Sequence, residues 1–209
     1  FLGGMTFILF YQMLKGDWRA LKINTEFRWY MGFIVLFCGV VSWILWKENT
    51  YGTFMDSIRY GTFQVMSLLT TTGFCTADYE KWPKAAQMFL YASCFIGACA
   101  GSTTSGIKVV HYVIIWKYMV ASIKKIFFQP MAVVTVRLNR RPVDRLIIDL
   151  SICYFIVNIF LVLGGGCFMV LVDDMDYVSG MSCIIVTMMN CVIYQFGRDY
   201  PEIIAITLT

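Results

Sequence analysis

The sequence predicts an all-α membrane protein that is built from repeated units of a span, a re-entrant loop and a second span. Of its 209 residues, 59% are hydrophobic and 14% are charged, and the mean hydropathy of +0.68 lies outside the range usual for soluble proteins. Five uncharged runs have about the 18 to 25 residues that a bilayer crossing needs. They are residues 29–46, 60–77, 85–107, 150–172 and 177–197.

The charges between the runs indicate which runs cross the membrane. If all five crossed, the basic segments 15–28 and 108–149 would lie on opposite sides, against the positive-inside rule. If run 60–77 instead enters and leaves on the outer side, both basic segments are cytoplasmic. The cytoplasmic segments then carry a net charge of +8 and the outer segments −4. Run 177–197 is interpreted as re-entrant in the same way, because acidic residues flank it.

This order of segments divides the chain into five parts, which we expect to belong to a longer protein. Residues 1–14 are the expected tail of a preceding span, and residues 15–28 are a cytoplasmic link. Residues 29–126 form one complete repeat with a broken second span. Residues 127–149 form a cytoplasmic connector, and residues 150–209 form part of the next repeat. The chain therefore holds about one and a half repeats.

Residues 70–74 read TTTGF and lie inside the first re-entrant run. Extended backbone at membrane depth survives only where it is buried in protein or lines a watery cavity. A row of carbonyls that lines a pore can replace the hydration shell of a cation. Thr71 and Thr72 add hydroxyl oxygens, Gly73 permits unusual backbone angles, and Phe74 completes the motif. These four residues are the predicted filter for a monovalent cation.

The preceding stretch, residues 52–69, is expected to form a short helix whose C-terminal dipole points toward the ion. The alternative is one Ser/Thr-rich helix in which the hydroxyls bond back to carbonyls of the same helix.

A second stretch, FIGACAGSTTSGIKVVHY at 95–112, turns from an apolar span into small residues. Such a run breaks or loosens a helix and allows close approach of backbones, so it can act as a gate below the filter. The alternative is a small-residue face for helix packing. Lys108 either lines the cavity or extends to the interface. The candidate gating residues are Gly97, Gly101, Ser102, Thr103, Thr104, Ser105, Gly106 and Lys108.

With these stretches the sequence resembles the Trk family of bacterial potassium-uptake membrane subunits, part of the superfamily that includes the Ktr and plant HKT transporters. TTTGF is similar to the filter of the third repeat, and GACAGSTTSGIKVV to the intramembrane loop. MAVVTVRLNRRPV resembles the connector to the fourth repeat. Residues 3–30 resemble the end of the second repeat and its link.

The resemblance implies four M1/pore-loop/M2 units around one pore, as in potassium channels, in a multi-pass protein of the bacterial cytoplasmic (inner) membrane. It implies uptake of K⁺, gated by the intramembrane loop, with no organic cofactor in this chain. It also implies a homodimer within the lipid bilayer and a cytosolic nucleotide-binding regulatory subunit, and no nucleic acid. Glycine rather than serine at position 73 favours potassium over sodium.

The sequence departs from the family pattern at two sites. Thr104 and Ser105 stand where the family usually has glycines. In the fourth filter, Asn190 and Cys191 are followed by Val192 where a glycine is expected, and valine resists the backbone angles that glycine accepts. These departures leave a sodium-permeable or non-conducting paralogue as an alternative.

A membrane enzyme is the alternative from a different class. Its signature would be ionisable residues inside the membrane, and the uncharged runs contain none besides cysteines. We therefore expect no enzymatic activity.

Overall fold

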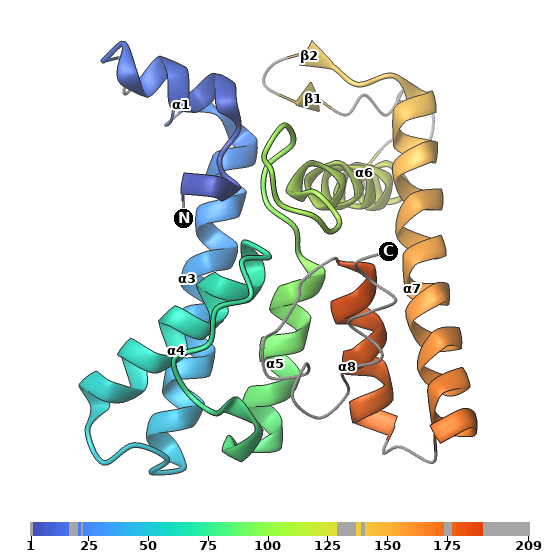
Figure 1. The fold of residues 1–209 in the computed structure, drawn as a ribbon. Coiled ribbons are helices and arrows are strands. Elements are labelled where there is room, and N and C mark those ends of the chain that lie inside the picture. The colour runs from blue at the N-terminus through green and yellow to red at the C-terminus, as the bar shows by residue number, and fades with distance from the viewer. Residues whose placement is uncertain are drawn as a thin grey trace.

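The helices of the chain stand mostly alongside one another, as the computed structural model in Figure 1 shows. The structure describes residues 2–16, 21, 23–128, 137–138, 141–173 and 177–189. Most of these residues are helical, and the predicted all-α class is confirmed. The described strands are a pair of two residues each in the connector, β1 (Arg137–Leu138) and β2 (Arg141–Pro142), which pair antiparallel.

Among the residues that the structure describes, two helices are long and apolar enough to cross a membrane. They are α3 (Thr25–Lys47) and α7 (Arg145–Asp173), which stand at opposite edges of the bundle in Figure 1. Helix α3 begins four residues before the uncharged run at Trp29, because the Asn24 side chain caps it by accepting a hydrogen bond from Phe27 N at 3.1 Å.

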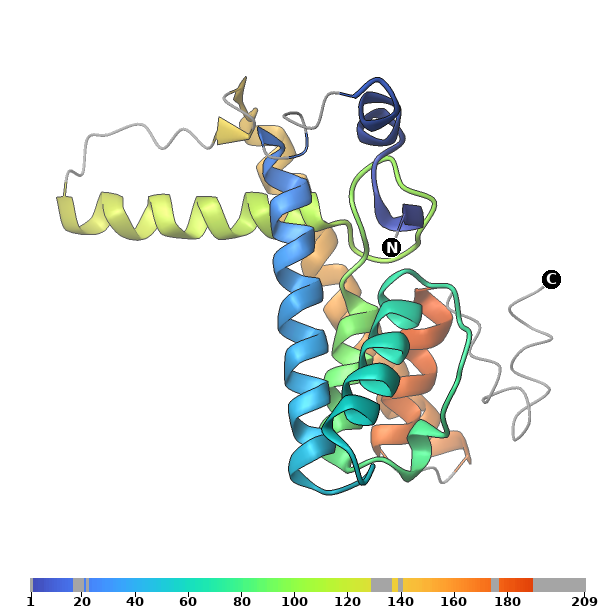
Figure 2. The ribbon, with the colours of Figure 1, turned by 90° about the vertical axis from the view of Figure 1, so that its left-hand side faces the viewer.

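The chain after α3 is re-entrant. Helix α4 (Phe54–Leu69) starts at the C-terminal end of α3 and ends partway along it. The chain then returns through residues 70–83 to the same end, where α5 (Lys84–Phe95) begins (Figures 1 and 2). Helix α4 approaches α3 closely at Gly61, where an added Cβ would lie 3.0 Å from Ser42 Oγ.

A hydrophobic core cluster of this unit lies between α3, α4 and α5. Its buried members include Leu45, Val65 and Leu90. The returning segment contains a short 3-10 helix, η2 (Tyr79–Lys81), and the Trp82 indole donates a hydrogen bond to Tyr51 Oη at 2.9 Å. This contact anchors the return of the chain beside the C-terminal end of α3.

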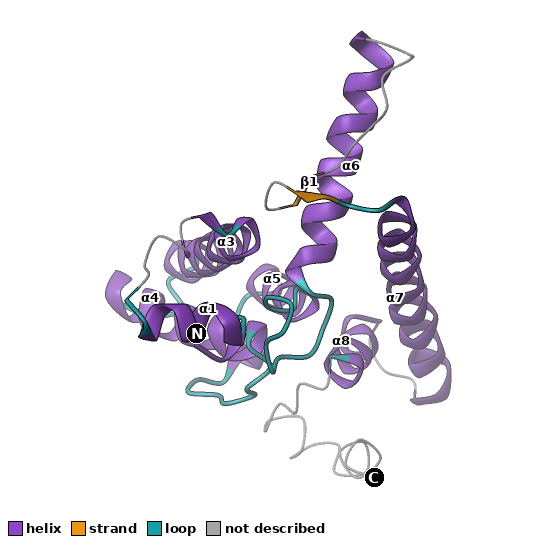
Figure 3. Cartoon of the chain, turned by 90° about the horizontal axis from the view of Figure 1, so that it is seen from above, coloured by secondary structure: helices purple, strands orange, loops and turns teal. Residues whose placement is uncertain are grey.

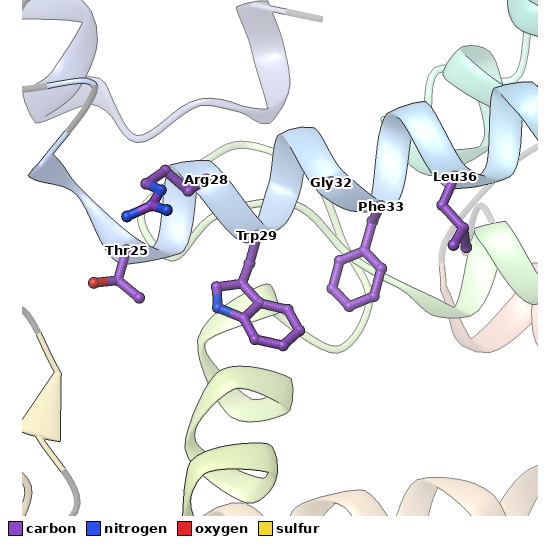
Figure 4. Close-up of a pocket in the computed structure, with 6 residues that line it drawn as sticks. All are labelled: Thr25, Arg28, Trp29, Gly32, Phe33 and Leu36. Carbon is purple, nitrogen blue, oxygen red and sulfur yellow. The ribbon is translucent and has the colours of Figure 1, made fainter.

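The second half of the unit is a broken helix. Helix α5 ends at Phe95, residues 96–108 form a loop, and α6 (Val109–Phe128) then runs across α3 instead of along it (Figures 2 and 3). The crossing of α3 and α6 is aromatic, with the Trp29 and Trp116 ring centroids 6.3 Å apart. Beside it, one face of α3 opens into a hollow of about 420 Å³ (Figure 4). Its lining residues are Thr25, Arg28, Trp29, Gly32, Phe33 and Leu36.

Helices α7 and α8 (Tyr177–Met188) repeat the order and direction of α3 and α4. They pack closely through glycines. A Cβ added at Gly166 would lie 2.8 Å from Met181 Cγ, and one added at Gly165 would lie 3.2 Å from side-chain atoms of Ile184. The small side chains therefore let the second re-entrant helix lie directly against its span.

Residues 2–14 do not form one continuous helical tail. They form a short 3-10 turn, η1 (Leu2–Gly4), and a separate helix α1 (Phe7–Leu14). Gly4 packs so closely on Tyr30 that a Cβ there would collide with the phenol oxygen. Between the two elements, Thr6 is extended and contacts the loop that follows α5.

Candidate functional site

Helix α4 ends in a left-handed turn that opens the TTTGF segment. Thr71 N donates to Leu68 O at 2.9 Å, and Thr72 N donates to Ser67 O at 2.8 Å, which is the hydrogen-bond pattern of a Schellman motif. The left-handed position is occupied by Thr71, with a φ of +50°. A residue with a Cβ costs about 1 to 2 kcal/mol in this conformation, so the turn is held by its surroundings.

Backbone handedness alternates along the next two residues. Gly73 has a φ of +79°, whereas Thr72 between the two left-handed residues has an ordinary negative φ. Among the residues that the structure describes, no backbone N–H donates to the carbonyl oxygens of Thr71 or Thr72. These carbonyls are therefore available to a cation, as the filter prediction requires.

The three threonine hydroxyls have different partners. Thr70 Oγ1 donates to Met66 O at 2.6 Å and lies 2.7 Å from Thr72 Oγ1. Because the Thr70 proton goes to the carbonyl, the Thr72 hydroxyl is the donor between the two, and its oxygen can still accept. The back-bonded helix that was the alternative for this stretch therefore applies to Thr70 alone, since α4 ends at Leu69.

Two residues that the sequence analysis did not identify support the filter segment through hydrogen bonds. The Cys75 thiol lies 3.8 Å from Gly73 O, and Gln64 Nε2 donates to Cys75 Sγ at 3.2 Å. Gln64 is fully buried in α4. Phe74, by contrast, is 70% exposed. The sequence did carry a signal for this role, namely a glutamine amide among the apolar residues of the predicted helix.

The predicted gating residues lie in a narrow loop whose two sides pair. Ile96 and Ile107 form a parallel bridge, Gly97 N donates to Ile107 O at 2.9 Å, and Val109 N donates to Ala98 O at 3.1 Å. A Cβ at Gly97 would lie only 2.8 Å from Ser105 O. The small residues therefore permit a close approach between the two backbone segments of this loop. They do not form a face for the packing of two helices.

The loop contacts the filter segment directly. Ser105 N donates to Thr71 Oγ1 at 3.3 Å, so one hydrogen bond joins the two groups of residues that the sequence singled out separately. On the other side of the loop, Gly106 has a φ of +88°, and a Cβ there would lie 3.2 Å from Met189 Sδ. The end of the second re-entrant helix therefore reaches the same loop.

Lys108 points into the loop itself. Its ammonium donates to Thr104 O and lies 3.4 Å from both Ser102 O and Ser102 Oγ. At the tip, Gly101 adopts a φ of +75° and the Thr103 hydroxyl donates to Gly3 O at 3.4 Å. The ammonium therefore satisfies carbonyls of the loop.

Glu26 is the site residue that the sequence analysis missed. It was counted as a charge of the cytoplasmic link, but in the structure it is only 9% exposed and its carboxylate accepts a hydrogen bond from Ala100 N. Thr6 joins the same residue, donating from Oγ1 to Ala100 O at 2.8 Å. An acid in the first turn of a helix is common, so the sequence carried no signal for this contact.

The remaining candidate residues, Asn190 and Cys191, lie outside the described residues, as does Val192. Within the described part of the chain, no three His, Cys, Asp or Glu side chains gather in a group that could hold a metal ion. The candidate cation ligands in this part are therefore backbone and threonine oxygens.

Fold and site together define a class of membrane protein in which a span and a re-entrant helix carry an extended, oxygen-rich segment at membrane depth. Comparison with known proteins agrees, because residues 18–190 match the model of TrkH, a cation transport protein family. The chain belongs to the TrkH family.

The relatives it matches are named for potassium uptake. It is 29% identical over 192 residues to the Trk system potassium uptake protein TrkH of Escherichia coli, covering 90% of this chain and 39% of that protein. It is 29% identical over 181 residues to the protein of the same name from Halomonas elongata, covering 83% and 36%. The chain thus spans well under half the length of these relatives.

The fold is shared with a solved structure. The crystal structure of the potassium transporter TrkH from Vibrio parahaemolyticus matches with a TM-score of 0.81 at 24% sequence identity, covering all of this chain and 50% of that one. This match confirms the fold of repeated span, pore-loop, span units.

Proposed function

We propose that this chain is the third repeat and part of the fourth in the membrane subunit of a potassium-uptake system, and that it carries K⁺ across the bacterial cytoplasmic membrane. The same proposal includes the five parts predicted from the sequence, whose boundaries lie after residues 14, 28, 126 and 149. The observation that carries it is the segment after α4, where two left-handed residues flank Thr72 and the carbonyls of Thr71 and Thr72 accept no backbone hydrogen bond from a described residue.

Potassium passes this segment by exchanging its water for protein oxygens. The ligands are carbonyl oxygens from Thr71 to Phe74 and the Thr72 hydroxyl, with Asn190 and Cys191 as the corresponding positions of the fourth repeat. The membrane potential supplies the driving force, since one charge crossing 100 mV gains about 2.3 kcal/mol. No chemical step is needed, so we propose transport and not catalysis as the role of the chain.

Below the filter, the loop of residues 96–108 is the proposed gate. Its support is the hydrogen bond from Ser105 N to Thr71 Oγ1, which puts the loop next to the filter segment. The loop changes conformation when the cation passes. We further propose a homodimer and a cytosolic nucleotide-binding subunit that controls the gate, in keeping with the basic connector.

A sodium-permeable or non-conducting paralogue is the second candidate. One observation favours it, namely Val192 at the position where the fourth filter is expected to hold glycine. A β-branched residue does not readily adopt the left-handed angles that Gly73 has in the third repeat.

Rubidium uptake by the complete reading frame tests the proposal in cells that lack their own potassium importers. Gly73→Asp places a side chain at a φ of +79° and a charge in the filter, and should abolish uptake. Gly52→Asp is the matched control, because Gly52 is exposed in the turn before α4 with nothing within 4 Å of an added Cβ.

Uptake that is lost in the first variant and kept in the second, with equal amounts of protein in the membrane, supports the filter. Equal uptake in both variants, or none above background in the parent, refutes the transport proposal. Competition by sodium in the same assay separates the two candidates, since sodium inhibits rubidium uptake strongly only in a sodium-permeable protein.

A further inference from the structure

Glu26 is a buried carboxylate in the first turn of α3, 74 positions before the residue that it contacts. Its side chain accepts a hydrogen bond from the backbone N–H of Ala100, near the tip of the loop. A carboxylate out of water needs such a donor, and the bond is stronger than one between neutral groups because the acceptor is charged.

The loop is held between two opposite charges. Glu26, outside the loop, accepts a hydrogen bond from a backbone N–H of the loop. The Lys108 ammonium, at the end of the loop, donates hydrogen bonds to the carbonyls of Ser102 and Thr104. The hydrogen bonds of Lys108 stay inside the loop and fix its shape, and its charge is also attracted to the Glu26 carboxylate. The contact of Glu26 ties the loop to the rigid start of a membrane span.

The other contacts between the loop and its surroundings are neutral. Cys99 N donates to Gly4 O at 3.1 Å, Thr6 Oγ1 donates to Ala100 O at 2.8 Å, and Ser105 N donates to Thr71 Oγ1 at 3.3 Å. Among the contacts between described residues, the bond to Glu26 is therefore the one charge-assisted bond that must break when the loop moves away from the filter.

We propose that Glu26 is the latch of the intramembrane loop: its carboxylate holds Ala100 and thereby keeps the loop closed beneath Thr71. This inference deepens the proposed transport function and rests on it. Glu26 is a positioning residue, because it acts through the loop backbone. Loss of the charge favours the open loop, so the basal flux rises instead of falling.

The test uses the complete protein, purified and reconstituted in liposomes, with Glu26→Gln as the variant. Glutamine keeps the length and one oxygen acceptor but removes the charge. Glu48→Gln is the matched control, because Glu48 follows the other end of the same helix and is exposed. Two quantities are measured: rubidium flux, and hydrogen exchange of the peptide that contains residues 96–108.

Exchange of the loop amides should be about 10-fold faster in Glu26→Gln, as expected for the loss of about 1.4 kcal/mol from a charge-assisted bond. Basal rubidium flux should rise several-fold, while both quantities stay at the parental level in Glu48→Gln. Exchange at the parental level in Glu26→Gln refutes the latch. If the parent conducts rubidium, faster exchange in Glu26→Gln without a rise in its flux also refutes the latch. The loop is then released without opening a path for the ion.

The exchange measurement distinguishes failure of the latch from failure of the proposed transport. If the parent conducts no rubidium but exchange is still faster in Glu26→Gln, the latch is supported and the transport function is not. Glu26→Asp covers the case in which Glu26→Gln fails to fold, because it keeps the charge but shortens the side chain that accepts the hydrogen bond from Ala100 N. It should raise exchange and flux in the same direction, and parental values in it refute the proposal.

Discussion

Replacement of Gly97 by alanine should open the intramembrane loop. An added Cβ would lie 2.8 Å from Ser105 O, 2.9 Å from the Gly106 carbonyl carbon and 3.0 Å from Ile107 O. All three neighbours are backbone atoms of the opposite side of the loop, so no flexible side chain can move aside. The two sides must therefore separate by several tenths of an ångström.

The magnitude follows from the bonds that this separation weakens. Gly97 N to Ile107 O, at 2.9 Å, and Val109 N to Ala98 O, at 3.1 Å, are the backbone bonds beside the contact. Each contributes about 1 kcal/mol net, and overpacking of a tight site costs about 1 to 3 kcal/mol. We expect the closed loop to lose about 2 kcal/mol, which shifts its equilibrium with the open loop about 30-fold.

Hydrogen exchange of residues 96–108 and basal rubidium flux in liposomes measure this shift. Gly39→Ala is the control, since a Cβ at Gly39 meets nothing within 4 Å and alanine favours helix α3. Faster exchange and higher flux in Gly97→Ala alone are the expected results. If the loop of Gly97→Ala exchanges as slowly as that of Gly39→Ala, the close approach of the two backbones does not hold the loop, and the reasoning is wrong.

Three further predictions concern the filter, the return of the chain and the second repeat. Thr71→Val removes the acceptor for Ser105 N and should loosen the loop and raise basal rubidium flux, whereas Thr71→Ser should keep the flux near the parental value. Trp82→Phe loses the bond to Tyr51 and should destabilise the protein by about 1 kcal/mol, seen as a lower thermal midpoint in detergent. Gly166→Leu should separate α7 from α8 at a cost of about 1 to 3 kcal/mol, and unchanged yield and melting would contradict the close packing.

Helix boundaries show the limit of prediction from hydrophobic runs. The run that starts at Trp29 belongs to a helix that starts at Thr25, and the run that starts at Leu150 belongs to one that starts at Arg145. A helix does not end where its apolar residues end, because polar residues at the membrane surface continue the same backbone hydrogen bonds. The existence of each span was predictable, and its first turn was not.

The N-terminal segment shows a different limit. The assignment of residues 1–14 to the tail of a span stays a prediction, and the described part of this segment is divided between η1 and α1. The division follows from two tertiary contacts: Gly4 packs against Tyr30, and Thr6 donates to the loop at Ala100. Neither partner is near in the sequence, so local pattern could not reveal the break.

The sequence by itself determined the membrane class, the re-entrant run and the two functional stretches. Those inferences rest on apolar length, on the side of the membrane that basic residues prefer, and on the backbone freedom of small residues, all of which are local properties. Only the tertiary structure decided that Thr71 meets Ser105 and that Glu26 holds Ala100. These hydrogen bonds join positions 34 and 74 residues apart, and their partners are set by how the helices pack, which no local pattern records.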